Sequence, residues 1–360
     1  MMKSRPELRI LAVLAALSAI AIPSLADLAP GSGSRNQLAS AAMAELERQG
    51  FVGSVLVAMD GEVVYSRDCG FRKDLKVVPS YWIASISKQF TAAGILLLQQ
   101  RGKLDIHGSI ADYLPNVPAD KSGITIFQLL THTSGLPQNY AADGIADKGK
   151  ALNALLSTKL KFQPGERFSY ANDNYNILAI ILENVSGQRF EDFLRKEILL
   201  PAGMEHSGFW GEPADDGAYV PPTITPLSDS ISQPNWGFRG ATGMRASVPD
   251  LFAWTKMLKS EKLLSGESVA LLMGNHVQAA KGTEVGFNWF GRHTEDGIYT
   301  KFSPGSESFG GNAVIYLYPS ENLVIITATN AGPAETGDGP VEGWSRKAHN
   351  ALAGIFLDPF

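Results

Sequence analysis

The distribution of apolar and polar positions predicts β-strands at both ends of the chain. The segment SVLVAMDGEVVYSRD, residues 54–68, places Asp60-Gly61 between two β-forming runs; this pair is a strong hairpin signal because both turn positions tolerate a positive φ. Strand-forming segments return late in the chain as TEVGFNWFGR (283–292), GIYTKF (297–302), NAVIYLY (312–318) and NLVIITATN (322–330). A turn at 319–322 is expected to join the last two.

The middle of the chain has the period of helices instead. Apolar or small residues occupy positions 90, 93, 94, 97 and 98, one face of a helix that should end near Gly102. Two further amphipathic runs, Tyr175–Val185 and Phe190–Ile198, are separated by a Ser-Gly pair and stopped by Pro201. Long loops rich in Pro and Gly follow, notably 211–240, and a last helix is expected at about 341–356.

This order of elements predicts an α+β fold, in which an antiparallel β-sheet flanked by helices is built from both ends of the chain. We expect a discontinuous α/β sheet domain at 37–103 and 236–360, with a mostly helical domain inserted at 104–235. A cleft between the two domains is the expected place for a site.

The first 26 residues differ in kind from the rest. Lys3, Arg5 and Arg9 precede the apolar stretch 10–22, and small residues follow at 24–26. Thirteen residues are too few to span a bilayer as a helix, so we expect a signal peptide at 1–26, with an uncleaved membrane anchor as the alternative. Residues 27–36 read as a flexible lead-in. The expectation is a secreted or periplasmic protein with no stable membrane span after cleavage.

Charge and cysteine content narrow the function classes. The chain has 31 basic and 36 acidic residues and no basic stripe, which argues against nucleic acid as a partner. The single cysteine, Cys69, allows no internal disulfide, and its place at the expected end of a strand favours packing over catalysis. The histidines show no metal-ligand spacing, and no H-E-x-x-H motif occurs.

Ser85 and Lys88 form a Ser-x-x-Lys pair just before the first long helix. Residues three apart on a helix share a face, so the amine would stand beside the hydroxyl and activate it as a nucleophile. Unpaired N–H groups at the helix start would then help to hold an oxyanion. The spacing alone is also compatible with an ordinary surface lysine behind a serine N-cap.

Several longer segments carry a resemblance to a known family. They are FVGSVLVAMDGEVVYSRDCGFR, IASISKQFTA, TIFQLLTHTSGLP, FQPGERFSYANDNYNILAIILENVSGQRFEDFL and PAGMEHSGF. Together, from about Ala42 to Asn330, they resemble the serine hydrolase superfamily of class C β-lactamases and DD-peptidases, which includes related esterases and D-aminopeptidases. The resemblance implies a mixed α/β domain with a helical domain, and acyl-enzyme chemistry without a metal or other cofactor.

By this resemblance Ser85 is the nucleophile and Lys88 its partner base. Tyr170, in the segment YAN, would relay protons to the leaving group and from water, and Asn172 would donate to Lys88 or to a substrate amide. Positive charge nearby would favour ionisation of the tyrosine. Two simpler interpretations stay open: Tyr170 as a core aromatic residue, and Asn172 as the cap of the helix at 173–186.

The third family motif is where the sequence departs. The family has a triplet led by Lys or His and ending in Gly, whereas the best match here is Ser303-Pro304-Gly305. Lys301 is the alternative if the register is shifted. Gly305 would let a substrate approach the strand, and the Ser306 N–H would be the second oxyanion donor.

A serine in that position changes the expected substrate, because it cannot neutralise a carboxylate. We therefore rank a small-molecule ester or amide first, a peptidoglycan-derived peptide second and a β-lactam third, unless Arg239 or Arg245 supplies the missing charge. The rival hypothesis is a non-catalytic protein on the same fold that binds or senses a cell-wall peptide. His132, at a helix end before Ser-Gly-Leu-Pro, is expected to fix a loop, and GFNWFG to be a core strand.

Overall fold

The computed structural model describes residues 34–70, 77–212, 233–306, 311–330 and 343–358. The expected signal peptide and residues 27–33 of the lead-in lie outside the described residues. The α-helices are α1 Arg35–Arg48, α2 Ser87–Gln100, α3 Ile126–Leu130, α4 Lys148–Leu156, α5 Asn172–Ser186, α6 Phe190–Leu194, α8 Val248–Ser260, α9 Gly266–Met273 and α10 Trp344–Phe356. Shorter turns are the 3₁₀ segments η3 Ala84–Ile86, η4 Ile110–Asp112 and η7 Pro319–Glu321, and the π-helical η5 Arg195–Leu199.

The strands form one large sheet and one small one. Their bounds are β1 Gly53–Met59, β2 Glu62–Cys69, β3 Tyr81–Trp82, β4 Gly208–Phe209, β5 Met244–Ala246, β6 Val277–Ala280, β7 Thr283–Val285, β8 Phe290–His293, β9 Tyr299–Ser306, β10 Asn312–Tyr318 and β11 Leu323–Thr329. The large sheet has the order β2-β1-β11-β10-β9-β8-β7-β6, and its neighbours are antiparallel. The small sheet has the order β3-β5-β4.

The pairing of β1 with β11 joins the two ends of the described chain. Gly53 lies opposite Thr329 and Met59 opposite Leu323, which places the N-terminal hairpin beside the last strand. The hairpin turn is as expected, with Asp60 at φ 51° and Gly61 at φ 85°. The prediction of an α+β fold with an antiparallel sheet built from both ends is confirmed.

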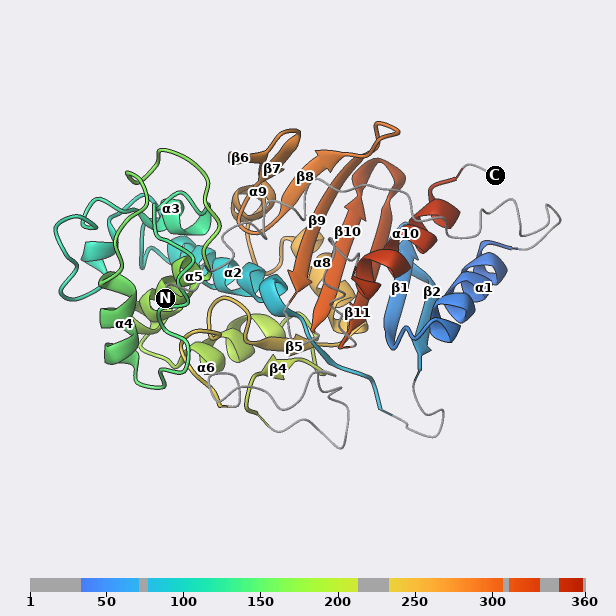
Figure 1. The fold of residues 1–360 in the computed structure, drawn as a ribbon, viewed down its shortest axis with the longest axis horizontal. Helices are drawn as coiled ribbons and strands as arrows, with labels where there is room; N and C mark the ends of the chain where they lie inside the picture. Colours follow the sequence, from blue (N-terminus) through green and yellow to red (C-terminus); the bar gives the residue numbers. More distant parts are fainter. Residues whose placement is uncertain (1–33, 71–76, 213–232, 307–310, 331–342, 359–360) are drawn as a thin grey trace, which may run out of the picture.

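The central strands are buried on both faces, which explains why they read as continuous apolar runs. In β10 the odd-numbered Ala313, Ile315 and Leu317 join the core shared with α2 and α8, whereas Val314 and Tyr316 join the core beneath α1 and α10. Because successive strand residues point to opposite faces, each strand serves both cores. In Figure 1, α1 and α10 lie across one face of the sheet and α8 lies behind it.

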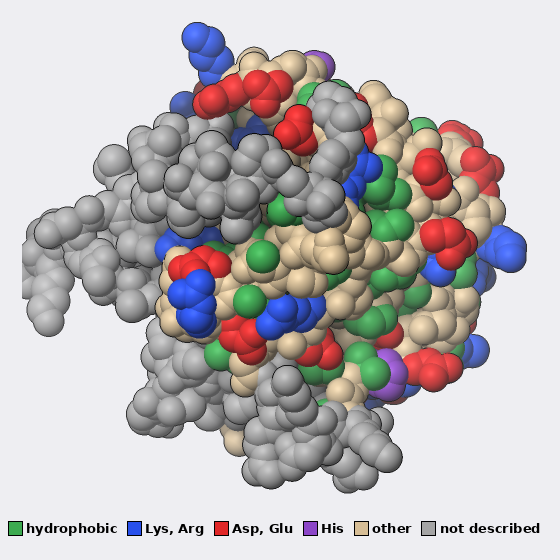
Figure 2. Space-filling view, turned by 90° about the vertical axis from the view of Figure 1, so that its right-hand side faces the viewer, with side chains coloured by type: hydrophobic (Ala, Val, Ile, Leu, Met, Phe, Trp, Pro, Cys, Tyr) green, Lys and Arg blue, Asp and Glu red, His purple; other side chains and the backbone are tan. Residues whose placement is uncertain are grey.

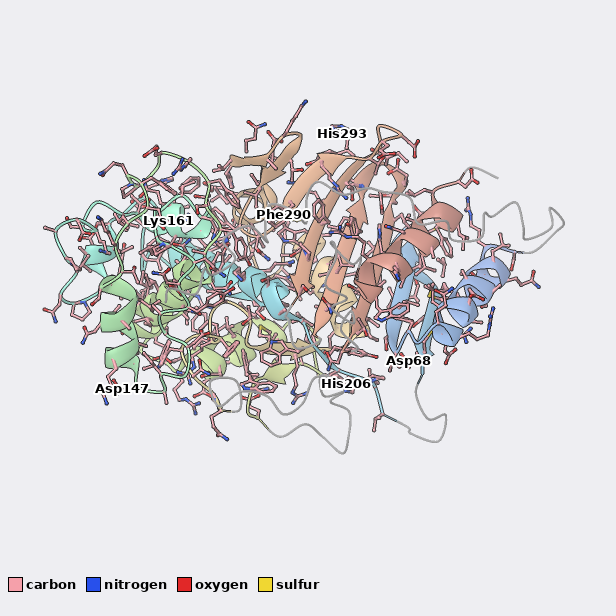
Figure 3. The ribbon with its side chains drawn as sticks, in the orientation of Figure 1. Asp68, Asp147, Lys161, His206, Phe290 and His293 are labelled. Atoms are coloured by element: carbon pink, nitrogen blue, oxygen red, sulfur yellow. The ribbon has the colours of Figure 1, made fainter. Side chains whose placement is uncertain are left out.

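Helices α3 to α6 gather at one end of the sheet (Figure 1). Asp147 and Lys161 lie in this helical region, at the opposite end of the molecule from Asp68 on β2 (Figure 3). The expected division of α5 from α6 is confirmed, since Gly187 ends α5 in the left-handed conformation, at φ 69°. The domain boundaries given above stay a prediction.

Two sequence-based expectations need adjustment. The segment TEVGFNWFGR is two strands, β7 and β8, joined by a turn at 286–289 in which Asn288 has φ 65°. Phe287 and Trp289 are fully buried there, so the aromatic residues belong to the core although they lie in a turn. In addition, α1 begins at Arg35, inside the expected lead-in, because Ser34 and Gln37 form a capping box.

The described surface and helices add two plain findings. Acidic and basic side chains are interspersed over the described part of the face in Figure 2. Within the described ranges, every helix is too short or too polar to cross a bilayer.

Candidate active site

Ser85 lies on the 3₁₀ turn η3, directly before α2. The turn is held from two sides: Ile83 N donates to Met244 O (3.1 Å), and the buried Ser87 Oγ accepts from Met244 N (3.1 Å). Ala84 is forced to φ 48°, a left-handed conformation that costs an L-residue free energy. The fold therefore fixes Ser85 on a strained turn at the helix start and leaves its side chain partly exposed.

Ser85, Lys88 and Tyr170 are brought together by the fold. Tyr170 OH lies 2.7 Å from Ser85 Oγ, and Lys88 Nζ donates to Ser85 Oγ over 3.1 Å. The lysine is fully buried, donates also to Ala241 O at 3.0 Å, and lies 5.0 Å from the centroid of the Tyr170 ring. Two groups that can accept a proton, an amine and a phenol, therefore contact the Ser85 hydroxyl.

Asn172 begins α5, two residues after Tyr170. Its backbone N–H donates to Gln138 Oε1 (2.5 Å), which secures the helix start next to Tyr170. The side chain is nearly buried, and its Oδ1 has no hydrogen-bond partner within the described structure. The alternative interpretation of Asn172 as the helix cap is wrong, because Ala171 is the N-cap of α5. Its expected donation to Lys88 or to a substrate amide stays a prediction.

Strand β9 runs past the nucleophile with Gly305 at the point of closest approach. A Cβ on Gly305 would lie 2.0 Å from Ile83 O and 3.2 Å from Ser85 N, so only glycine fits there. Ser306, the next residue, ends β9 and is exposed. Gly305 therefore lets β9 lie against the backbone at Ser85, and Ser306 is the residue whose N–H is expected to be the second oxyanion donor.

Ser303 is on the same strand but is fully buried. Its Oγ accepts from Asn288 Nδ2 at 3.2 Å, and the same amide donates to Ser85 O at 2.8 Å. Asn288 thus ties the backbone of the nucleophile to the third motif. The sequence analysis did not single out Asn288. The one available signal was its residue type, because Asn tolerates the left-handed backbone that it adopts there.

The family model described as Beta-lactamase matches residues 35–343 of this chain. The chain belongs to the β-lactamase family of serine hydrolases. Its relatives include penicillin-binding protein 4* of Bacillus subtilis, 28% identical over 312 residues, which cover 78% of this chain and 69% of the relative. The chain spans about 60% of the length of the curated relatives that follow.

Solved structures share the fold. A penicillin-binding protein from Bacillus halodurans superposes with a TM-score of 0.71 at 22% identity, over 88% of this chain and 99% of the other. D-amino acid amidase from Ochrobactrum anthropi, in complex with D-phenylalanine, superposes with a TM-score of 0.71 at 18% identity, over 90% of this chain and 99% of the other.

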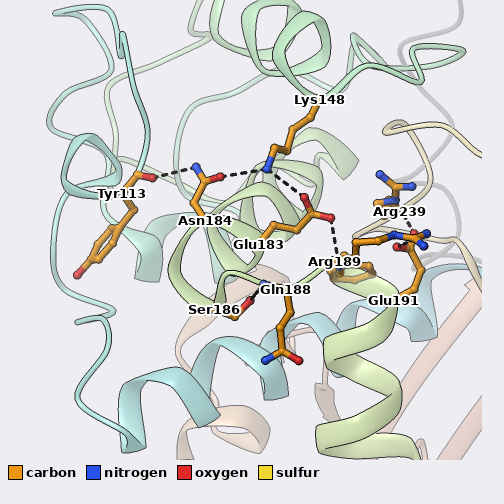
Figure 4. A network of polar contacts seen from close by, with 10 residues as sticks. Tyr113, Lys148, Glu183, Asn184, Ser186, Gln188, Arg189, Glu191 and Arg239 are labelled. Carbon is orange, nitrogen blue, oxygen red and sulfur yellow. Dashed lines mark hydrogen bonds and ion pairs between the residues drawn. The ribbon is translucent and has the colours of Figure 1, made fainter.

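In this β-lactamase-family chain, the three basic side chains that could replace the missing cation of the third motif are bonded to other protein groups. Lys301 Nζ donates to Asn275 Oδ1, and burial lowers the pKa of Lys301 to about 8. Arg239 Nε donates to Glu191 Oε1 at 2.5 Å (Figure 4). Arg245 pairs through its backbone in the small sheet and donates to a serine, Ser80. None of these contacts places a cation beside Ser303.

The Cys69 thiol and the possible metal ligands were the other candidates for chemistry. Burial raises the pKa of the Cys69 thiol to about 11, which makes a thiolate nucleophile unfavourable. Among the described residues, no three His, Cys, Asp or Glu side chains are grouped so that they could hold a metal ion.

Proposed function

We propose that this chain is an exported serine hydrolase that cleaves an ester or amide bond through an acyl-Ser85 intermediate. The observation that carries the proposal is the pair of hydrogen bonds at Ser85 Oγ, one with Lys88 Nζ and one with Tyr170 OH. A serine hydroxyl needs a base within hydrogen-bond reach, and here two candidate groups are in contact with it. Export rests on the signal-like segment 1–26.

The proposed reaction proceeds in two halves. Tyr170, held as a phenolate beside the Lys88 ammonium, takes the Ser85 proton as Oγ attacks the substrate carbonyl. The tetrahedral intermediate places its oxyanion against the N–H groups of Ser85 and Ser306. Tyr170 then gives the proton to the leaving alcohol or amine. In deacylation the same phenolate takes a proton from water as the water oxygen attacks the acyl carbon. The bond from Ser85 Oγ to the acyl carbon then breaks, Tyr170 returns its proton to Oγ, and the acid product leaves.

The buried Ser303 supports an uncharged substrate. A hydroxyl that is fully buried and accepts from Asn288 offers no positive charge to a terminal carboxylate. An ester or neutral amide is therefore the first candidate, a peptidoglycan-derived peptide the second and a β-lactam the third. A relative in the solved structures is named as an amidase for D-amino acids.

The test begins with a fluorophosphonate probe on the purified chain. The proposal expects labelling at one residue, lost in Ser85→Ala and retained in the control Ser260→Ala, which removes an exposed hydroxyl at the end of α8. Labelling that persists in Ser85→Ala would remove this nucleophile. Lys88→Ala and Tyr170→Phe should each lower p-nitrophenyl ester turnover by ~10²–10⁴-fold.

The substrate class is decided by a panel of short-chain esters, a D-Ala-D-Ala peptide and a chromogenic cephalosporin. The non-catalytic alternative, a sensor for cell-wall peptides, is favoured only by the loss of the usual cation at Ser303. Intact-mass measurement after acylation separates the two: an adduct that clears with time supports the hydrolase, and one that persists supports the sensor.

A further inference from the structure

His132 packs against the ring of Tyr170, the residue whose hydroxyl contacts Ser85. Its ring stacks on the Tyr170 ring, with centroids 4.4 Å apart and planes at 29°. His132 is 1% exposed, and its backbone has the left-handed conformation, at φ 57°. Phe168 packs edge-on against the same ring, and Ser169 N donates to His132 O at 2.9 Å. The histidine therefore contacts the tyrosine segment through both ring and backbone.

The hydrogen bonds of His132 determine its tautomer. Nδ1 is 3.2 Å from the Ala171 N–H and 3.1 Å from Asn174 Nδ2, so it accepts and the proton is on Nε2. Nε2 has no partner within the described structure. Burial, together with the positive charge of Lys88, holds the pKa of His132 well below its usual range. The imidazole is thus neutral, and a proton on Nδ1 would break the bond to Ala171.

We propose that His132 is a positioning residue: a neutral imidazole that fixes the Tyr170 phenol against Ser85 by stacking on its ring and by binding the Ala171 N–H. The inference rests on the proposed function, in which Tyr170 transfers the Ser85 proton. Ala171 lies between Tyr170 and Asn172, so the bond to Nδ1 locks the backbone of both. An uncharged ring also leaves the Lys88 ammonium to set the protonation of the phenol.

The ionisable groups that face this ring come from two elements. Lys88 reaches it from α2, and Tyr170 and Tyr175 from the segment that begins α5; the Tyr175 ring lies 5.2 Å from His132. Tyr175 donates to Leu130 O, and burial with the neighbouring Tyr170 raises its pKa well above 10. Lys88 and Tyr170 are therefore the pair whose titration a change at His132 should alter.

Two substitutions separate the functions of the ring. His132→Phe keeps a stacking ring but has no acceptor for the Ala171 N–H. His132→Asn keeps an acceptor near the Nδ1 position and tolerates the left-handed backbone. A catalytic group that is misplaced by ~1 Å can cost ~10²-fold in rate. We therefore expect His132→Phe to lower kcat for the ester at least tenfold with little change in KM. The same substitution should shift the pH profile of kcat/KM. His132→Asn should recover part of the rate.

The matched control is His349, a second buried histidine far along the chain on α10. It stacks on Tyr316 (centroids 3.6 Å apart) and its Nε2 lies 2.9 Å from Tyr318 OH, and burial lowers its pKa to about 3. His349→Phe should lower the unfolding midpoint but leave kcat and the pH profile of the folded protein unchanged. A similar pH shift in His349→Phe would overturn the positioning function of His132.

A double-mutant cycle with Tyr170→Phe identifies the partner through which His132 acts. If His132 works by positioning the phenol, His132→Phe has little further effect on kcat once the hydroxyl is absent. An equal loss in both backgrounds, or a wild-type rate for folded His132→Phe, contradicts the proposal. Failure of the proposed function has a different result, since Tyr170→Phe alone would then keep the wild-type rate.

Discussion

Asp173, next to Asn172 on the first turn of α5, should make the free energy of unfolding depend on pH. The side chain is 1% exposed, and its Oδ1 has no hydrogen-bond partner within the described structure. Burial raises its pKa to about 7, the N–H groups of Ala141 and Asn139 lower it, and the charge of Asp143 raises it further. A carboxyl group that holds its proton only in the folded state disfavours folding once the solution pH removes that proton.

The sign and size follow from the two pKa values. Between pH ~4 and pH ~7 the unfolded chain loses the Asp173 proton while the folded chain keeps it, so the free energy of unfolding falls as pH rises and stays low above pH ~7. A difference from 3.8 to about 7 corresponds to about 4 kcal/mol. Asp173→Asn removes the ionisation, so relative to wild type it should gain up to ~4 kcal/mol between pH 4 and pH 8. Part of that gain is offset by weaker acceptance from the backbone N–H groups.

The assay is urea unfolding of the full chain at pH 4, 6 and 8, compared with Asp173→Asn. The control is Asp60→Asn, which removes the same charge from an exposed turn at φ 51° where Asn is also tolerated. A gain that grows with pH in Asp173→Asn but not in Asp60→Asn supports the reasoning. A gain that is constant with pH, or a loss at pH 8, would refute it.

Two further substitutions test the backbone of the site. Gly305→Ala would bring a Cβ to 2.0 Å from Ile83 O, so we expect ester turnover to fall at least tenfold. The matched control Gly123→Ala, which has open space around it, should keep wild-type activity. Normal turnover in Gly305→Ala would show that β9 can shift without harm. Asn288→Gly keeps the left-handed backbone but removes the donors to Ser85 O and Ser303 Oγ, so kcat should fall and the free energy of unfolding should drop by about 1–3 kcal/mol. An unchanged kcat would show that Asn288 contributes to stability alone.

Much of the fold could be predicted because its local signals agree with one another. Asp60-Gly61 sets the first hairpin, and Gly187 ends α5. The segment 286–289 shows where local reasoning fails, since its aromatic residues read as a strand although the fold needs a turn there. Phe287 and Trp289 are buried by neighbours that are distant in the sequence, and this burial outweighs their strand propensity.

The sequence by itself determined the chemistry that this protein can carry. Ser85 and Lys88 are three residues apart, and helical geometry alone puts them on one face. Only the tertiary structure decided that Tyr170 completes the contact, because α2 and the start of α5 are brought together by long-range packing. The same packing brings Asn288 to the backbone of Ser85 and His132 to the ring of Tyr170. Such long-range contacts depend on how the whole chain buries its core, so no local sequence pattern predicts them.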